Sequence, residues 1–256
     1  MALRRTPQAL RCRRTCNNVR ECRRKLKKTI LNDPHLEGLL DRLHARSEAQ
    51  STAIQDHYDE QDRAGRAPDE QAALTRAFLA DKIYALDRDK AEFCYHLCRT
   101  INARTVVEIG TSYGVSTLYL AAAVRDNVRA TGGSGVVIGT EYEPEKVRAA
   151  RHNFDEASLT NFIDLREGDL RQTLRQIEGP VDFMLVDIWI PMARPALEIV
   201  TPHLRPGAVV TCDNTGRDDE REAYRDYFAF INGPARRFRT MTLPFSGGLE
   251  MSVRLA

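Results

Sequence analysis

The apolar positions of this chain follow two periodicities, one typical of strands and one typical of helices. The most informative stretch is 105–124, where an apolar run (Val106, Val107, Ile109) meets a glycine-containing turn and then a long apolar segment. Such a run predicts a buried strand, a tight turn and the start of a helix. The same order recurs along the rest of the chain, which predicts right-handed βαβ units and a parallel sheet.

The pattern predicts further strands at 136–141, 162–166, 181–187 and 208–213, and two closing β segments at 238–243 and 249–255 joined by a hairpin connection at 244–248. Helices are predicted from Pro144, over 193–200 and over 218–231. Upstream, apolar residues at helical spacing predict helices over 33–63, from Asp69 as far as Ile83, and from Asp87. These upstream helices either pack on the sheet or cover the turn at 108–114, and the sequence leaves both arrangements open.

Composition favours a globular chain with a charged appendage. The chain has 256 residues, of which 42% are hydrophobic and 29% charged, and no apolar run reaches the roughly 20 residues that span a bilayer. We expect a basic arm at 1–32, helices at 33–103 and the main domain at 104–256. Residues 1–30 carry a formal charge of +10, so the remaining residues carry −8 although the total is only +2.

The basic arm has several interpretations. It is a solvated tail or the product of a misassigned start codon, a mitochondrial-type presequence, or a segment for weak contact with nucleic acid or a membrane surface. No aromatic residue interrupts its charges, which disfavours base stacking and therefore specific nucleic-acid binding. No apolar leader is present in the first 30 residues, so we expect a cytoplasmic protein, with mitochondrial targeting by the arm as the alternative.

Cysteine usage favours reduced thiols. Three cysteines lie in the arm with a spacing that matches no standard zinc pattern, and the other three lie in predicted core elements (Cys12, Cys16, Cys22; Cys94, Cys98, Cys212). We therefore expect a reducing compartment.

The turn that follows the first strand carries the pattern E-x-G-x-x-x-G, from Glu108 to Gly114. Gly110 lets the backbone approach a ligand, and the following helix offers free N–H groups to an anion. A second acid, Glu141, ends the next strand, where it can accept hydrogen bonds from the ribose of a nucleoside. The glycine spacing of a dinucleotide site is absent, so the pattern favours S-adenosylmethionine. The simpler interpretation is a strand-to-helix turn of any α/β protein.

Acids stand at or beside the ends of five successive predicted strands (Glu108, Glu141, Asp169, Asp187, Asp213). Because ligands bind outside the carboxyl ends of parallel strands, this row indicates a site for a cation, either a sulfonium or a divalent metal. Asp187, Asp213 and Asn214 offer the oxygen ligands that Mg²⁺ prefers. The alternative is that 213–216 forms only a turn.

The run from about 69 to 256 resembles the metal-dependent O-methyltransferases of the catechol and caffeoyl-coenzyme-A type, within the class I S-adenosylmethionine-dependent methyltransferases. The resemblance rests on VVEIGTSYGVST (106–117), GTEYEP (139–144), REGD (166–169), FMLVDIW (183–189), VVTCDN (209–214) and the closing SGGLEMSVRL. It implies an α/β, Rossmann-like fold whose seven-stranded, mainly parallel sheet has an antiparallel last strand, with helices on both faces and extra N-terminal helices. Members of the family commonly form dimers.

By position, the resemblance implies a set of donor-binding residues (Glu108, Gly110, Thr111, Ser112, Gly114, Ser116, Glu141, Tyr142, Gly168, Asp169, Asp187, Trp189). It implies Asp187, Asp213 and Asn214 as metal ligands, Asp187 as the catalytic residue among them, and a small hydroxylated, catechol-like methyl acceptor. Other interpretations are a metal-independent methyltransferase that acts on nitrogen or on another hydroxyl, and a non-catalytic binding module.

One position departs from the family pattern. Family members usually carry a lysine three residues after the first metal aspartate, near the reacting hydroxyl. This chain has Ile190 there, and an aliphatic side chain accepts no proton. Another group would then serve as base, or the metal alone would acidify the hydroxyl. The sequence places neither His203 nor Lys82 in the site.

Overall fold

The computed structural model describes residues 30–65, 67–216, 222–235 and 237–256. Most of the predicted basic arm, with Cys12, Cys16 and Cys22, lies outside these residues. The chain divides into two compact units, 1–37 and 38–256. In the first, the Asp33 carboxylate accepts a hydrogen bond from the backbone of Leu36 at 3.2 Å, at the start of α3 (Pro34–Ala64).

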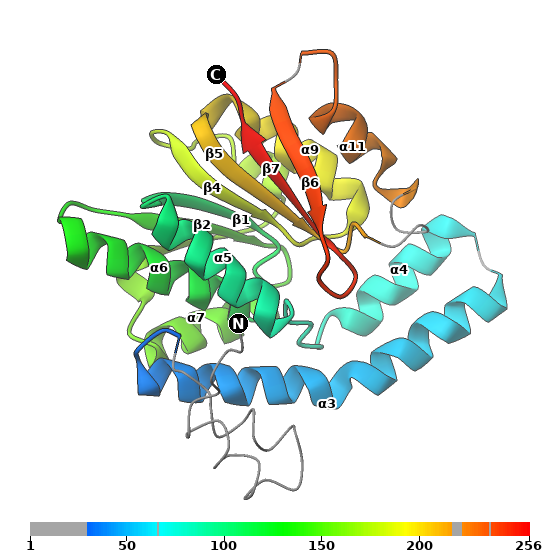
Figure 1. Cartoon of the computed structure of the whole chain (residues 1–256). Coiled ribbons are helices and arrows are strands. Elements are labelled where there is room, and N and C mark those ends of the chain that lie inside the picture. Colours follow the sequence, from blue (N-terminus) through cyan, green and yellow to red (C-terminus); the bar gives the residue numbers. More distant parts are fainter. Residues whose placement is uncertain (1–29, 66, 217–221, 236) are drawn as a thin grey trace, which may run out of the picture. The chain divides into compact units, whose positions relative to one another are not determined.

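The second unit contains one seven-stranded sheet (Figure 1). Its strands are β1 (Thr105–Ile109), β2 (Val136–Glu141), β3 (Ile163–Glu167), β4 (Val181–Val186), β5 (Leu204–Asp213), β6 (Phe238–Leu243) and β7 (Leu249–Arg254). The strand order is β3-β2-β1-β4-β5-β7-β6, with β7 antiparallel to both of its neighbours. The predicted fold class is confirmed, including the antiparallel last strand.

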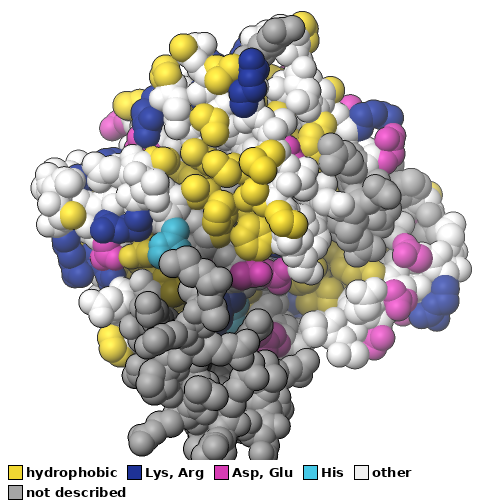
Figure 2. Space-filling model, in the orientation of Figure 1, with side chains coloured by type: hydrophobic (Ala, Val, Ile, Leu, Met, Phe, Trp, Pro, Cys, Tyr) yellow, Lys and Arg dark blue, Asp and Glu magenta, His cyan; other side chains and the backbone are white. Residues whose placement is uncertain are grey.

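Helices cover both faces of the sheet. The helices of this unit are α4 (Pro68–Leu79), α5 (Arg88–Thr100), α6 (Val115–Thr131), α7 (Pro144–Glu156), α8 (Leu170–Thr173), α9 (Ile190–Val200) and α11 (Arg225–Ile231), together with the part of α3 that begins at Gly38. In Figure 1, α5 and α6 lie in front of the sheet, and α9 and α11 lie behind it. Among the residues that the structure describes, no helix covers the front of β6 and β7, and Figure 2 shows apolar side chains gathered in that area, where Met241 is 58% exposed.

The alternation of β1 decides which side chains reach each layer. Val107 and Ile109 belong to the core shared with α9 and α11, whereas Glu108 faces the opposite layer and bonds to α6. The strand is buried almost throughout because helices cover both of its faces. A carboxylate is therefore enclosed within the sheet, just before the turn that leads into α6.

Several predicted boundaries were wrong. β5 begins at Leu204 and not at 208, because Leu204 already pairs with Val181 before a register shift around Pro206 and Gly207. α4 ends at Leu79, so the buried Ile83 lies in the connection to α5. The predicted helix at 218–231 is described only in part, as α11, since residues 217–221 lie outside the described regions.

The sequence left open whether the upstream helices pack on the sheet or cover the turn at 108–114. For α5 the structure shows the first arrangement, because this helix packs on the sheet. Cys94 Sγ lies 3.8 Å from the Thr211 hydroxyl of β5. Cys94, Cys98 and Cys212 are buried and have free thiols, as the sequence predicted. Among the described residues, no helix combines the length and the apolar character needed to traverse a bilayer.

Candidate functional site

Strand register brings the predicted site residues to one edge of the sheet. Ile109 pairs with Thr140 on one side and with Val186 on the other, and Val186 pairs with Cys212. The residues that follow, Gly110, Glu141, Asp187 and Asp213, therefore leave four neighbouring strands at the same level. Parallel strands lie about 4.8 Å apart, so these groups can act on one ligand.

The β1–α6 turn lies against the end of β4. Gly110 has φ +95°, and a Cβ atom there would overlap the carbonyl oxygen of Asp187. Gly114, at the N-terminus of α6, has φ +80°, and a Cβ atom there would lie 2.7 Å from Cζ of Phe154. Both glycines are required by their positive φ and by the lack of space. The turn consequently presents backbone and not side chains at these positions.

Ser112 and Thr111 complete the turn. Ser112 is held in the left-handed region at φ +51°, and its buried hydroxyl has no hydrogen-bond partner in the structure. Thr111 is buried, and its backbone N–H donates to the Thr140 carbonyl at 2.9 Å. Ser116 follows within the first turn of α6 and is 5% exposed. The turn therefore carries an unpaired donor of the kind that a bound ligand satisfies.

Glu108 is fully buried under this turn. Its Oε2 accepts hydrogen bonds from Thr111 at 3.0 Å and from Thr117, while its Oε1 has no partner. Burial raises the pKa of Glu108, and hydroxyl groups including that of Ser116 offset part of this rise. A buried carboxylate with one unpaired oxygen favours a neighbouring cation or hydrogen-bond donor.

Glu141 joins the two ligand-facing loops. Its Oε2 accepts the backbone N–H of Ser112 at 2.7 Å, and its Oε1 accepts those of Tyr142 and Glu143, each at 2.8 Å. Tyr142 is 56% exposed, and the Arg76 guanidinium lies 4.4 Å from its ring centroid. α4 therefore contacts the loop after β2.

The loop after β3 is built around Gly168 and Asp169. Gly168 has φ +117°, and its N–H donates to the Glu141 carbonyl at 2.8 Å. The Asp169 side chain caps α8 by accepting from the backbone of Arg171 at 2.9 Å, and it also pairs with the guanidinium of that residue. This pairing lowers the pKa of Asp169. Trp189 precedes α9 and is 41% exposed.

The carboxylates at the ends of β4 and β5 form the acidic part of the site. Burial raises the pKa of Asp187 well above its usual range, and Asp213 and Glu108 raise it further. The pKa of Asp213 is also raised by burial, although Lys90 opposes this effect. Two buried carboxylates at the ends of neighbouring strands are stabilised when a cation lies beside them. Asn214 follows with φ +57°, and a Cβ atom at Gly247 of the β6–β7 connection would lie 2.8 Å from its Oδ1.

The sequence analysis missed two residues of this region. Lys90 of α5 is 1% exposed, and its Nζ lies 2.5 Å from Asp213 Oδ1. Tyr84 precedes α5 and is 52% exposed, and its partial burial together with the charges of Tyr58, Asp187 and Asp213 raises its pKa to about 12. Lys90 precedes Phe93 and Cys94 by three and four residues, so it shares their apolar helix face. A lysine on an apolar face was the signal that could have identified it.

The residues discussed above in connection with the hydroxyl proton lie on three separate segments of the chain. Ile190 begins α9 and packs against the core on that side of the sheet. His203 lies just before β5, at the amino ends of the strands and therefore on the opposite edge. Lys82 pairs with Asp81 and lies 5.0 Å from the ring centroid of Phe78.

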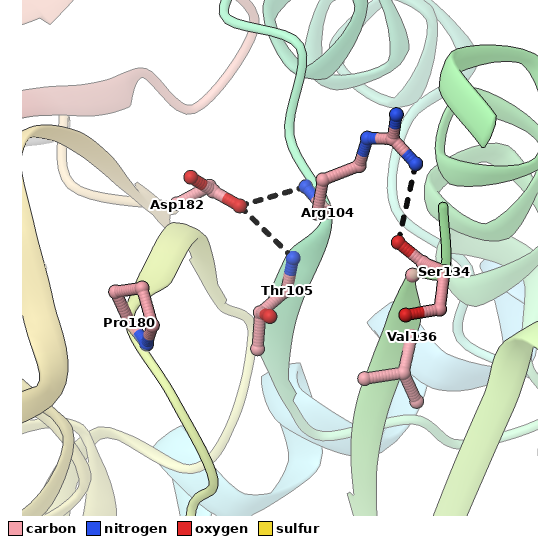
Figure 3. Close-up of a pocket in the computed structure, with 7 residues that line it drawn as sticks. Arg104, Thr105, Ser134, Val136, Pro180 and Asp182 are labelled. Atoms are coloured by element: carbon pink, nitrogen blue, oxygen red, sulfur yellow. Dashed lines mark hydrogen bonds between the residues drawn. The ribbon is translucent and has the colours of Figure 1, made fainter. Parts of the chain in front are cut away.

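A cavity of about 420 Å³ lies at the opposite edge of the sheet, where β1, β2 and β4 begin (Figure 3). Asp182 lines it, and its Oδ2 accepts the backbone N–H groups of Arg104 at 2.7 Å and Thr105 at 2.9 Å. Its Oδ1 accepts from Arg205 Nε at 2.6 Å. Asp182 therefore serves to hold strand ends together, and the cavity contains none of the predicted site residues.

Across the described parts of the chain, no three His, Cys, Asp or Glu side chains converge as a metal cluster. The predicted metal set does not conflict with this finding, because it contains two acids and an amide. Asp187 and Asp213 lie at the ends of adjacent strands, with Asn214 next in sequence.

Comparisons with known proteins agree with this geometry. Residues 107–215 match the model of a methyltransferase domain. A catechol O-methyltransferase of Niastella koreensis is 28% identical over 192 residues, which cover 73% of this chain and 83% of that protein. A catechol O-methyltransferase of Mycobacterium tuberculosis is 31% identical over 134 residues, which cover 52% of this chain and 58% of that protein.

A solved structure shares the fold. The O-methyltransferase from Bacillus cereus in complex with SAH is 20% identical, with a TM-score of 0.59, and the match covers 84% of this chain and 99% of that one. These findings set aside the interpretation as a non-catalytic binding module. These comparisons support an S-adenosylmethionine-dependent O-methyltransferase that is similar to the enzymes of the catechol and caffeoyl-coenzyme-A type.

Proposed function

We propose that this enzyme transfers the methyl group of S-adenosylmethionine to a hydroxyl oxygen of a small, catechol-like molecule at the carboxyl edge of the sheet. The observation that carries the proposal is the register that aligns Gly110, Glu141, Asp187 and Asp213 on four neighbouring strands. We assign Gly110 and Glu141 to the donor side, where S-adenosylmethionine would bind. We assign Asp213 to the acceptor side, where the hydroxyl compound would bind, and Asp187 lies between the two.

On the donor side, the free N–H groups at the start of α6 receive the carboxylate of the methionine moiety, as helix N-termini do for anions. The unpaired Oε1 of Glu108 and the unpaired hydroxyl of Ser112 supply polar groups near this end. Glu141 accepts hydrogen bonds from the ribose, exchanging some of its present backbone partners for them. Tyr142, Asp169 and Trp189 border the adenine.

On the acceptor side, the reaction is an in-line displacement at the methyl carbon. The acceptor hydroxyl releases its proton to solvent, its oxygen forms the new C–O bond, the C–S bond breaks, and the electron pair of that bond returns to sulfur, which leaves as a neutral thioether. The carboxylates around Asp187, those of Asp213 and Glu108, favour binding of the cationic methyl donor. Holding donor and acceptor in fixed positions supplies much of the acceleration of methyl transfer. Ile190, at the position of the family's lysine, takes no proton in this scheme.

The chemistry of Asp187, Asp213 and Asn214 fits a hard divalent cation such as Mg²⁺. All three offer oxygen, and both carboxylates have raised pKa values that a cation would lower. Bound there, a metal would acidify a hydroxyl of the acceptor and orient it. The alternative is metal-independent methylation of a hydroxyl, which the ion pair of Asp213 with Lys90 favours.

The test is methyl transfer from labelled S-adenosylmethionine to a panel of vicinal diphenols, with Mg²⁺ and again with EDTA. We expect turnover that Asp213→Asn reduces at least tenfold, while S-adenosylhomocysteine binding measured by calorimetry persists. Asp164→Asn is the matched control, since Asp164 forms a surface pair with Arg166. Loss of S-adenosylhomocysteine binding in Glu141→Gln would support the donor side. Undiminished binding in that variant would contradict the donor assignment, and full activity in EDTA would contradict the metal.

A further inference from the structure

Lys90 is an ammonium group enclosed within the protein. Its side chain is 1% exposed and is among the largest fully buried side chains of the described residues. Enclosing a charge of this kind is costly unless a counter-charge accompanies it.

The counter-charges come from the acceptor side of the site. Lys90 Nζ lies 2.5 Å from Asp213 Oδ1 and 3.5 Å from Asp87 Oδ2. Both carboxylates therefore lie within ion-pair distance of the ammonium. Asp87 is 55% exposed, whereas Asp213 is 8% exposed, so the pair with Asp213 is the buried one.

The surroundings hold the ammonium in one place. A Cβ atom at Gly247 would lie 3.8 Å from Lys90 Nζ and 2.8 Å from Asn214 Oδ1, so the β6–β7 connection closes over both groups. Phe93, one turn further along α5, packs against Phe245 of the same connection at 5.4 Å between ring centroids. Two elements thus fix the position of the ammonium beside Asp213.

We propose that Lys90 is the resident cation of the acceptor side, a positioning residue that holds the Asp213 carboxylate and competes with a divalent ion for it. The inference rests on the proposed function only where it assigns Asp213 to the acceptor side. Asp213 then keeps its orientation whether or not a metal is bound.

The test measures Mn²⁺ affinity by calorimetry and by electron paramagnetic resonance, without donor or acceptor. Lys90→Met and Lys90→Gln remove the charge, and Gln keeps a donor for Asp213 in case the Met variant does not fold. We expect both to bind Mn²⁺ at least tenfold more tightly than the native chain, and Lys90→Arg to bind it as the native chain does. Adding Asp213→Asn should abolish the gain, which would assign the ion to Asp213.

Lys82→Met is the matched control, because it removes a lysine that pairs with the exposed Asp81. It should leave Mn²⁺ affinity unchanged. If Lys90→Gln binds Mn²⁺ within twofold of the native affinity, the inference is overturned. Calorimetry with S-adenosylhomocysteine separates the two proposals: failure of the native chain to bind it contradicts the proposed function, whereas the Mn²⁺ comparison judges Lys90 independently.

Discussion

The backbone of Gly110 lies so close to the backbone of Asp187 that a Cβ atom at Gly110 would overlap the Asp187 carbonyl oxygen and lie 2.9 Å from its carbonyl carbon. The contact joins the donor turn to the end of β4, and the N–H of Asp187 donates to the Ile109 carbonyl at 3.0 Å beside it. The position of Asp187 is therefore set by the absence of a side chain on the neighbouring strand.

Replacing Gly110 by alanine should destabilise the protein and abolish donor binding. The left-handed φ costs about 1–2 kcal/mol, and the overlap with backbone adds about 1–3 kcal/mol. Urea unfolding and S-adenosylhomocysteine calorimetry measure the two effects. Gly179→Ala is the control, because Gly179 has φ +72° with nothing within 4 Å of the added atom, so it reports the φ cost alone. Equal losses in the two variants would refute the role of the Asp187 contact.

Glu108→Gln should stabilise the ligand-free protein at neutral pH while weakening donor binding. A neutral amide removes the cost of a buried, partly unpaired carboxylate, on the order of 1–3 kcal/mol. Because burial raises the folded-state pKa of Glu108, the native state binds more protons than the unfolded state above the ordinary pKa of 4.5. The stability that protonation gives the native chain is lost as pH rises from 4.5 through the folded pKa.

The stability difference between Glu108→Gln and the native chain should therefore grow over that pH range and shrink at more acidic pH. Thermal melts between pH 4 and pH 8 measure this difference. A difference that does not change with pH would show that Glu108 is not ionised with a raised pKa in the ligand-free protein.

Arg76→Ala should weaken donor binding about two- to fivefold, because a cation over an aromatic ring contributes about 0.5–1 kcal/mol at an exposed site. Arg76 lies over Tyr142 and donates to Glu143 Oε1 at 3.1 Å, so its loss frees the loop that we assign to the adenine. Arg148→Ala is the control, since Arg148 pairs with Glu145 within its own helix. Calorimetry with S-adenosylhomocysteine makes the comparison, and equal affinities would contradict the assignment of Tyr142.

The thiols of Cys94, Cys98 and Cys212 should resist alkylation in the native protein at pH 8. Burial raises the pKa of Cys94 to about 12 and raises those of Cys98 and Cys212 well above the usual range, so thiolate is scarce and access is blocked. Iodoacetamide labelling followed by peptide mass spectrometry should detect these three sites only after unfolding in urea. Labelling of Cys94 as fast as that of a free cysteine would show that α5 separates from the sheet.

Asp182→Ala should destabilise the protein by roughly 2–4 kcal/mol and leave donor affinity unchanged. The change leaves two backbone N–H groups and the Arg205 guanidinium without their acceptor, at the edge opposite the candidate site. Chemical unfolding and donor calorimetry on the same variant separate the effects. A matching loss of donor affinity would mean that the two edges of the sheet are coupled.

The sequence was sufficient for the succession of strands along the chain and for placing acids at the ends of those strands, because periodicity and the glycine turn depend on local residues. The antiparallel last strand came from the family resemblance. The sequence failed where a contact joins distant segments. Nothing near Glu141 in sequence indicates that Ser112 donates to it, and Lys90 lies 123 residues from Asp213. The start of β5 was also misplaced, since Pro206 and Gly207 are typical of turns and the pairing of Leu204 with Val181 overrides that preference.

The place of β7 between β5 and β6 has a consequence for the order of folding. β6 pairs with β7 and not with β5, so a chain that has formed β1 to β6 still lacks the strand that joins β6 to the sheet. The sheet can close only when β7 inserts between them, and Asp213 pairs with Leu249, the first residue of that strand. Non-local pairing of this kind is slow, so the acceptor side should be the last part of the molecule to become ordered during refolding.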